Sequence, residues 1–142
     1  DEVPQLHRVG TLAHLQSVDA VQPALLQVVC QGGLRFVLAA PERGPYGVWY
    51  AQVQYLPADT AESIPPALQP LANMLGRLIA DAQQAGARQA LPIAAPYRLD
   101  ECGWVANRWT ELLPIPSDAK QRLLAEQDPL ARLHGIAAFV EL

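Results

Sequence analysis

The sequence predicts an α+β protein in which a β-rich part precedes a helical part. The first third carries apolar runs interrupted by glycine and proline, a pattern typical of strands and turns. From residue 68 onward the apolar residues recur instead at steps of three and four, which is the spacing of amphipathic helices. A polar connector containing prolines, residues 59–66, separates the two patterns. We therefore assign residues 1–60 to the β-rich part and residues 61–142 to the helical part.

Three apolar segments predict the strands of the first part. The runs 25–29 and 34–39 are separated by the turn pair Gly32-Gly33, so we predict that they form a hairpin. A further strand is predicted over residues 48–56, after a turn rich in glycine and proline. Its side chains alternate, and we expect one uniformly apolar face to lie on the core, formed by Trp49, Ala51, Val53 and Tyr55.

The helical part begins with a predicted amphipathic helix that runs to about residue 84 and is stopped by Gly86. Residues 87–99 contain two prolines and predict an irregular crossing. Asp100 is then predicted to cap a short helix that ends before Pro114. The apolar face of this helix is predicted from residues at helical spacing, namely Val105, Trp109, Leu112 and Leu113.

Two more helix starts follow. Ser117 is predicted to cap a helix through Gln127, and Asp128 followed by Pro129 predicts the start of the last helix, with aspartate as the cap and proline at the first helical position. The buried face of this last helix is predicted to consist of Leu130, Leu133, Ile136, Ala137 and Val140.

Composition and charge exclude several classes of protein. Of the 142 residues 51% are hydrophobic and 17% charged, which indicates a globular chain with neither a disordered composition nor an apolar stretch long enough for a bilayer. Because the opening residues also lack a secretory signal, we expect a cytoplasmic protein with no membrane partner. The net charge is −4, Lys120 is the sole lysine, and the arginines are scattered singly. No basic stripe exists to follow phosphates, so we expect no nucleic-acid partner.

The sequence contains no recognisable catalytic or metal-binding motif. It has no phosphate-binding G-x-x-x-x-G-K-[ST] loop, and no lysine besides Lys120 that could serve as a general base. His7, His14 and His134 have no partners at metal-ligand spacing. Cys30 and Cys102 are interpreted as buried thiols. We therefore expect a protein that is not an enzyme and that uses no metal or cofactor.

Several spaced segments together resemble a known family. In chain order they are GTLA at 10–13, GGLRF at 32–36, QYLP at 54–57, WVANRWTELLP at 104–114, KQRLL at 120–124 and DPLARL at 128–133. This set is similar to the amino-terminal, substrate-recognition domain of bacterial Lon proteases, in a stand-alone form without the ATPase and protease domains. The WVANRWTELLP and KQRLL segments are its most specific part, and the resemblance covers the chain from Gly10 onward.

The resemblance implies a β-rich subdomain of PUA-like, pseudo-barrel type followed by a small helical bundle. It also implies recognition of unfolded or degron-bearing polypeptides on behalf of an ATPase and protease partner. Family members normally begin with an additional apolar stretch, whereas Gly10 lies almost at the start of this sequence. We therefore expect the pseudo-barrel to be incomplete at its N-terminus, with an exposed strand edge and weak self-association.

Seven residues are the candidates for function or for a structural signature. Tyr46 is predicted at an exposed hairpin tip within residues 42–49, and tyrosine on a rigid loop suits contact with polypeptide. Trp49 and Arg35 complete the predicted binding set, although a plain turn and a solvent-facing strand residue explain Tyr46 and Arg35 equally well. The structural signature consists of Trp104, Asn107, Arg108 and Trp109.

For the signature residues we favour a structural role over ligand binding, because a tryptophan buries a large area at an interface. Asn107 and Arg108 are interpreted as fixing how helix meets sheet, with Glu111, Glu101 or a strand carbonyl as the partner of Arg108. The leading hypothesis is a polypeptide-binding module that uses the β-rich part and its junction with the helices. Two alternatives are a PUA-like nucleic-acid binder and a small-molecule sensor or scaffold.

Overall fold

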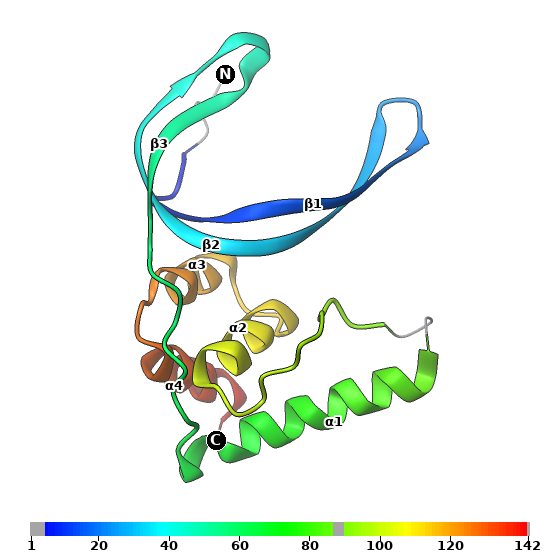
Figure 1. Cartoon of the computed structure of the whole chain (residues 1–142), viewed down its shortest axis with the longest axis vertical. Helices are drawn as coiled ribbons and strands as arrows, with labels where there is room; N and C mark the ends of the chain where they lie inside the picture. The colour runs from blue at the N-terminus through cyan, green and yellow to red at the C-terminus, as the bar shows by residue number, and fades with distance from the viewer. Residues whose placement is uncertain (1–4, 87–89, 142) are drawn as a thin grey trace. The chain divides into compact units, whose positions relative to one another are not determined.

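The computed structural model describes residues 5–86 and 90–141. The chain divides into two compact units, residues 1–58 and 59–142. As predicted, the fold is α+β: within these described residues, an antiparallel sheet in the order β1-β2-β3 precedes four helices (Figure 1). The strands are β1 (Val9–Gln22), β2 (Leu25–Arg43) and β3 (Trp49–Tyr55). The helices are α1 (Gln69–Ala85), α2 (Cys102–Leu112), α3 (Ser117–Ala125) and α4 (Pro129–Val140), with short 3-10 turns at Pro45–Gly47 and Pro66–Leu68.

The predicted hairpin turn at Gly32-Gly33 is wrong. Strand β2 runs straight through these glycines and pairs with β1, and the turn lies at residues 23–24, where Ala24 has a φ of 65°. The register shifts where Thr11 faces Arg35 and Ala13 faces Gly32, so the glycines mark an irregularity of the ladder. A Cβ atom at Gly33 would lie 2.5 Å from Nε2 of His14. A larger residue at position 33 would therefore require the exposed imidazole of His14 to move aside.

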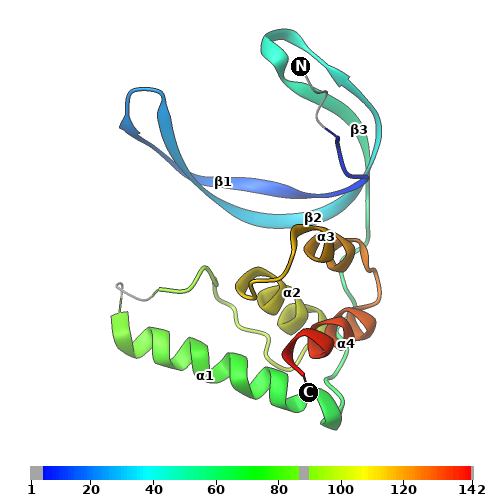
Figure 2. The same cartoon turned by 180° about the vertical axis from the view of Figure 1, so that it is seen from behind.

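Strand β3 is found where it was predicted, but its apolar face does not form a core. Trp49 is half-buried, whereas Ala51, Val53 and Tyr55 are exposed. None of the described residues from 5 to 58 is buried. Figure 2 shows the reason within this unit: the sheet is a single bent layer, with the β1–β2 ribbon and the β2–β3 hairpin extending in different directions. Side chains on such a layer stay in contact with solvent.

The helix boundaries correct two predicted caps. Helix α2 begins at Cys102 with Glu101 at the N-cap position, because the amide of Cys102 donates to the carbonyl of Glu62 at 2.8 Å and Asp100 is not used. Ser117 is the first residue inside α3, since the carbonyl of Pro116 accepts the first helical hydrogen bond, and the helix ends at Ala125. The start of α4 is confirmed: Oδ1 of Asp128 accepts from the amide of Leu130 at 3.0 Å.

The core of the protein lies in the helical unit. Helix α1 stops at Gly86 as predicted, and residues 90–99 contain neither helix nor strand. Helices α1, α2 and α4 bury one apolar stripe each against the others, as their spacing predicted. The residues with no exposed surface in this core are Leu71, Leu75, Cys102, Val105, Ala106, Leu133 and Ile136.

Candidate functional site

One face of the β1–β2 ribbon is apolar and open to solvent. Strand pairing sets Leu15 opposite Cys30, Val18 opposite Val28 and Ala20 opposite Leu26. Paired residues project on the same side, and the alternation along β2 puts these three pairs on one side of the ribbon. The large side chains remain 47–62% exposed. We call this surface the apolar ribbon face and define it as Leu15, Val18, Ala20, Leu26, Val28 and Cys30.

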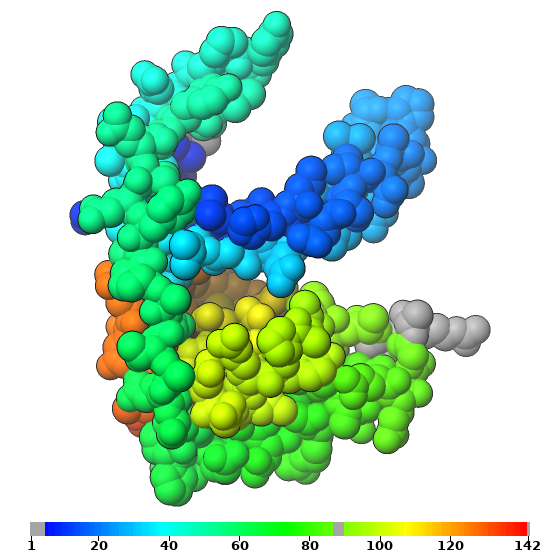
Figure 3. All heavy atoms as spheres, in the orientation of Figure 1, coloured from blue at the N-terminus to red at the C-terminus, as the bar shows by residue number. Residues whose placement is uncertain are grey.

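The opposite side of the same ribbon is mainly polar. There Asp19 pairs with Gln27, Ser17 with Val29 and His14 with Gln31. The ribbon is therefore amphipathic, in the manner of a strand pair that buries one side. Figure 3 shows the ribbon, in blue, as a thin arm of the β unit. A continuous exposed apolar surface of this kind is the usual mark of an interaction site.

Tyr46 lies at the tip of the β2–β3 hairpin, as predicted. The amide of Gly44 donates to the carbonyl of Val48 at 2.7 Å and closes the loop around the Pro45–Gly47 turn. Within this turn Tyr46 has φ 62° and ψ 18°, and its side chain is fully exposed. The left-handed conformation is unfavourable for a bulky residue. The loop thus holds an aromatic ring in solvent at some conformational cost, and such strain is common at functional positions.

The structure brings Tyr46 and Trp49 together on one hairpin but leaves Arg35 apart from them. Trp49 faces Arg43 across the strands, and the guanidinium of Arg43 lies 5.7 Å from the centre of the Trp49 ring. Arg35 is half-buried and faces Thr11, eight residues before Arg43 on β2. This separation corresponds to roughly 25 Å along a strand. The three residues do not form one site.

The two tryptophans of α2 have different surroundings. Trp109 is 5% exposed, and its Nε1 donates to the carbonyl of Leu71 at 3.0 Å, which joins α2 to α1. Trp104 is half-buried, and the ring of Tyr97 meets it edge-on at 6.2 Å. The guanidinium of Arg108 lies 5.5 Å from the Trp104 ring, and its buried Nε has no hydrogen-bond partner. Arg108 therefore packs on an aromatic face, and Glu101 pairs with Arg98 instead.

The polar centre of the helical unit is Arg132, which the sequence analysis did not single out. Its guanidinium is 1% exposed and binds both carboxylate oxygens of Asp59, at 2.6 and 3.2 Å. It also donates to Oδ1 of Asn107 at 3.2 Å and to the carbonyls of Leu123 and Glu126. This arginine thus joins the connector, α2, α3 and α4. The sequence feature that could have identified it is an arginine among the core-facing positions of the DPLARL segment, residues 128–133.

The sequence matches one family model over all of the described residues. The model for the ATP-dependent protease La (LON) substrate-binding domain matches residues 1–141. The chain belongs to this family.

Solved structures show the same fold. A Lon N-terminal domain protein from Xanthomonas campestris is 24% identical with a TM-score of 0.73, and the match covers 94% of this chain and 68% of that one. The N-terminal domain of a Mycobacterium avium complex Lon protease is 16% identical with a TM-score of 0.64, covering 99% of this chain and 74% of that one. The search of curated proteins gave no match.

Within this Lon substrate-binding domain, the described residues assemble no group of three or more side chains able to hold a metal ion. No helix in the same residues is long and apolar enough to cross a bilayer. Of the two thiols, Cys102 is buried as predicted, whereas Cys30 is exposed on the apolar ribbon face, so the interpretation of Cys30 as buried was wrong. The physical reason is again the single-layered sheet, which covers neither side of β2.

Proposed function

We propose that this Lon substrate-binding domain is a non-catalytic module that binds exposed apolar segments of unfolded or degron-bearing polypeptides. The observation that carries the proposal is the apolar ribbon face, whose large side chains are about half exposed on a ribbon with a polar back. An unfolded chain exposes the apolar segments that a folded protein hides. Contact with this face removes apolar surface of both partners from water.

The open sheet also offers a geometry for an extended segment. Strands β1 and β3 lie at its two edges. An added strand gains main-chain hydrogen bonds at such an edge, while alternate side chains reach one face. Tyr46 and Trp49, on the β2–β3 hairpin, are proposed to add aromatic contacts, and Arg35 to contribute separately from β2. The same edges support weak self-association.

The description of the matching family names an ATP-dependent protease. We propose that an ATPase and protease, attached or separate, receives the polypeptides bound here, and that the domain works in the cytoplasm, where ATP is available. On this view the chain contributes recognition, and its partner contributes unfolding and cleavage.

The proposal is tested by following the thiol of Cys30, which lies on the apolar ribbon face while Cys102 is buried. The protein is titrated with a reduced, carboxymethylated polypeptide and separately with single-stranded RNA at moderate salt, and the alkylation rate of Cys30 is measured. We expect saturable protection by the polypeptide and none by RNA. Protection by RNA alone, or by neither, would overturn the proposal.

A pair of adjacent substitutions supplies the matched control. Leu26 belongs to the apolar ribbon face, whereas Gln27 projects from the polar side. Leu26→Lys places a charge in the proposed contact and should weaken polypeptide binding by roughly tenfold or more, the equivalent of one lost apolar side chain. Gln27→Lys adds the same charge beside Asp19 and should leave affinity nearly unchanged. Equal effects of the two substitutions would assign binding to another surface.

A further inference from the structure

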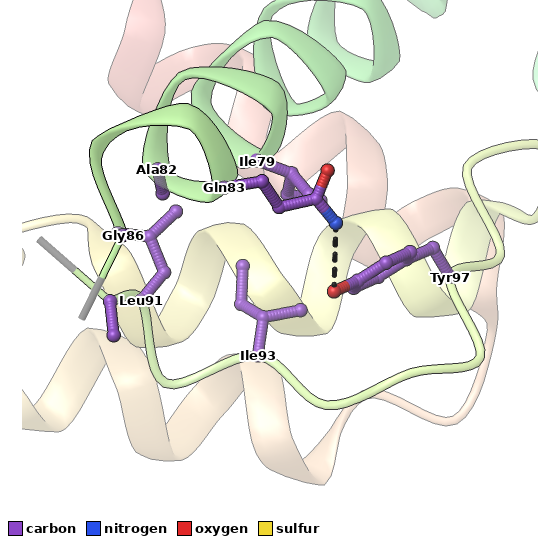
Figure 4. A pocket seen from close by; sticks show the side chains of 8 residues that line it. Ile79, Ala82, Gln83, Gly86, Leu91, Ile93 and Tyr97 are labelled. Carbon is purple, nitrogen blue, oxygen red and sulfur yellow. Dashed lines mark hydrogen bonds between the residues drawn. The ribbon is translucent and has the colours of Figure 1, made fainter.

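A separate cavity opens in the helical unit, between the second half of α1 and residues 90–97 (Figure 4). It has a volume of about 270 Å³. Leu91 and Ile93 reach toward α1 from the irregular segment, opposite Ile79 and Ala82. The remaining lining comes from Gln83, Gly86, Ala90 and Tyr97.

Of the described side chains that line the cavity, those of Gln83 and Tyr97 are polar and the others are apolar. Nε2 of Gln83 donates to the hydroxyl oxygen of Tyr97 at 3.3 Å, and both side chains are exposed to solvent. Among the described residues that line it, none is charged. The cavity therefore suits a neutral, apolar group, with a polar pair placed to meet an amide or carbonyl at its opening.

The size of the cavity limits what it can hold. A cavity of roughly 150 Å³ is large enough to bind benzene. Pockets for drug-sized ligands begin at roughly 300 Å³. The observed volume lies between these values and so fits one aromatic ring or one large branched side chain. The side chains of Gln83 and Tyr97 are exposed to solvent, so a molecule that inserts one group into the cavity can keep its remaining part outside.

We propose that this cavity receives one bulky apolar side chain, aromatic or branched, from a polypeptide substrate. The inference rests on the proposed function and adds a second contact that is selective for side-chain size. The polar pair of Gln83 and Tyr97 then hydrogen-bonds the peptide group next to the inserted side chain.

Tyr97 connects the cavity to helix α2. The ring of Tyr97 lines the cavity and also meets the ring of Trp104 edge-on, at an interplanar angle of 76°. Arg108 packs on Trp104 in turn. Insertion of a side chain beside Tyr97 changes the surroundings of Trp104, whose emission therefore reports occupancy. Trp104 and Arg108 act here as positioning residues for the cavity wall.

The test compares the binding of short peptides by the whole chain and by its variants. The probes are a short unfolded peptide with a central phenylalanine and the same peptide with alanine at that position. Ala82→Phe fills the cavity from α1, and Gln84→Phe adds the same ring to the exposed, non-lining side of that helix. Affinity is measured by titration, following tryptophan emission in a Trp49→Phe background, in which Trp104 and the buried Trp109 remain and only Trp104 is in ring contact with Tyr97.

We expect the wild-type chain to prefer the phenylalanine peptide by roughly tenfold or more, the equivalent of burying one large apolar side chain. Ala82→Phe should remove that preference, and Gln84→Phe should keep it. Leu91→Ala enlarges the cavity from the opposite wall and should shift the preference toward a tryptophan peptide. Leu91→Ala therefore keeps the test decisive if Ala82→Phe does not fold.

The outcomes separate the two proposals. A preference for phenylalanine that survives Ala82→Phe and does not change in Leu91→Ala would overturn the cavity assignment while leaving polypeptide binding intact. Failure of the wild-type chain to bind either the peptides or the carboxymethylated polypeptide would overturn the proposed function itself.

Discussion

Arg132 and Asp59 form a buried, two-pronged ion pair: Nη1 of Arg132 lies 2.6 Å from Oδ2 of Asp59, and Nη2 lies 3.2 Å from Oδ1. Asp59 is the first residue of the helical unit, and Arg132 lies on its last helix. The side chain of Arg132 is 1% exposed and that of Asp59 is 21% exposed. Two hydrogen bonds between one guanidinium and one carboxylate fix the connector against α4 more specifically than a single hydrogen bond would.

Loss of the carboxylate should destabilise the helical unit strongly. Asp59→Ala leaves the guanidinium of Arg132 buried without its counter-charge, and we expect a loss of about 3 kcal/mol in the free energy of unfolding. Urea denaturation followed by circular dichroism measures this loss in the free energy of unfolding. Asp118→Ala is the matched control, because Asp118 and Arg122 form an exposed ion pair one helical turn apart. An effect of Asp59→Ala as small as that of the control would contradict the importance of the pair.

A second prediction concerns the glycine that lets Asp59 approach α2. A Cβ atom at Gly103 would lie 2.5 Å from Oδ2 of Asp59, whose position is held by Arg132. Gly103→Ala should therefore cost about 1–3 kcal/mol, despite the better helix propensity of alanine. At Gly76 the nearest atom, of Leu99, would be 3.4 Å away, so Gly76→Ala should be neutral or stabilising.

The coupling between these positions can be checked directly. In an Asp59→Ala background the carboxylate that opposes the new methyl group is gone, so Gly103→Ala should add little further loss. Strictly additive losses in the double variant would show that the clash lies elsewhere.

Asn107 should affect stability more than binding. Its Oδ1 accepts from Nη1 of Arg132 at 3.2 Å, so Asn107→Ala removes one acceptor from a buried charged donor. We expect a loss of about 1–2 kcal/mol in the free energy of unfolding and an unchanged affinity of the folded protein for unfolded polypeptide. Asn107→Asp keeps an acceptor and should be milder. A variant that stays fully stable but no longer binds would assign Asn107 to the binding surface.

The helices were predictable from sequence because their periodicity records burial directly. Leu71, Leu75 and Ile79 recur at helical spacing and are buried, and Asp128-Pro129 carries its start signal in the local chemistry. Asp100 failed as a cap because the competing partner, the carbonyl of Glu62, lies far away in the sequence. Long-range backbone contacts of this kind leave no local pattern.

The sheet was less predictable for a related reason. In a single sequence, a glycine pair that forms a turn cannot be distinguished from a pair that lies within a strand, as Gly32 and Gly33 do beside His14. Alternation in β3 correctly predicted a strand, but it could not tell that the apolar side remains exposed. The exposed position of Tyr46 was predictable because its loop composition is distinctive, whereas the cavity beside Tyr97 depends on how an irregular segment folds back on α1.

The strained conformation of Tyr46 gives a test that separates function from folding. Tyr46→Gly removes the ring and relieves the positive φ of 62°, so stability should stay the same or rise by about 1 kcal/mol. Polypeptide affinity should fall several-fold, because the exposed ring is lost. Asparagine also tolerates a positive φ, so Tyr46→Asn should have the same effects on stability and affinity as Tyr46→Gly. If both variants bind as well as the wild type, the loop is a plain turn.

The last prediction uses the buried thiol of Cys102, whose Sγ donates to the carbonyl of Ser63 at 3.4 Å. Burial raises the pKa of this thiol above its ordinary value of 9.0, and the negative charges of Glu62 and Asp128 raise it further. Below pH 9.0 the thiol is neutral in both the folded and unfolded states, so its contribution to stability is fully present. Above that pH the unfolded state releases the proton first, and the free energy of unfolding falls until the folded thiol ionises as well.

Urea denaturation between about pH 8 and about pH 10 measures this effect. Cys102→Ala should lose stability less steeply with rising pH than the wild type. Cys30→Ala, which alters an exposed thiol, should keep the wild-type slope. Equal slopes for the wild type and Cys102→Ala would mean that the Cys102 thiol ionises with the same pKa in both states, and that its burial carries no pH-dependent stability.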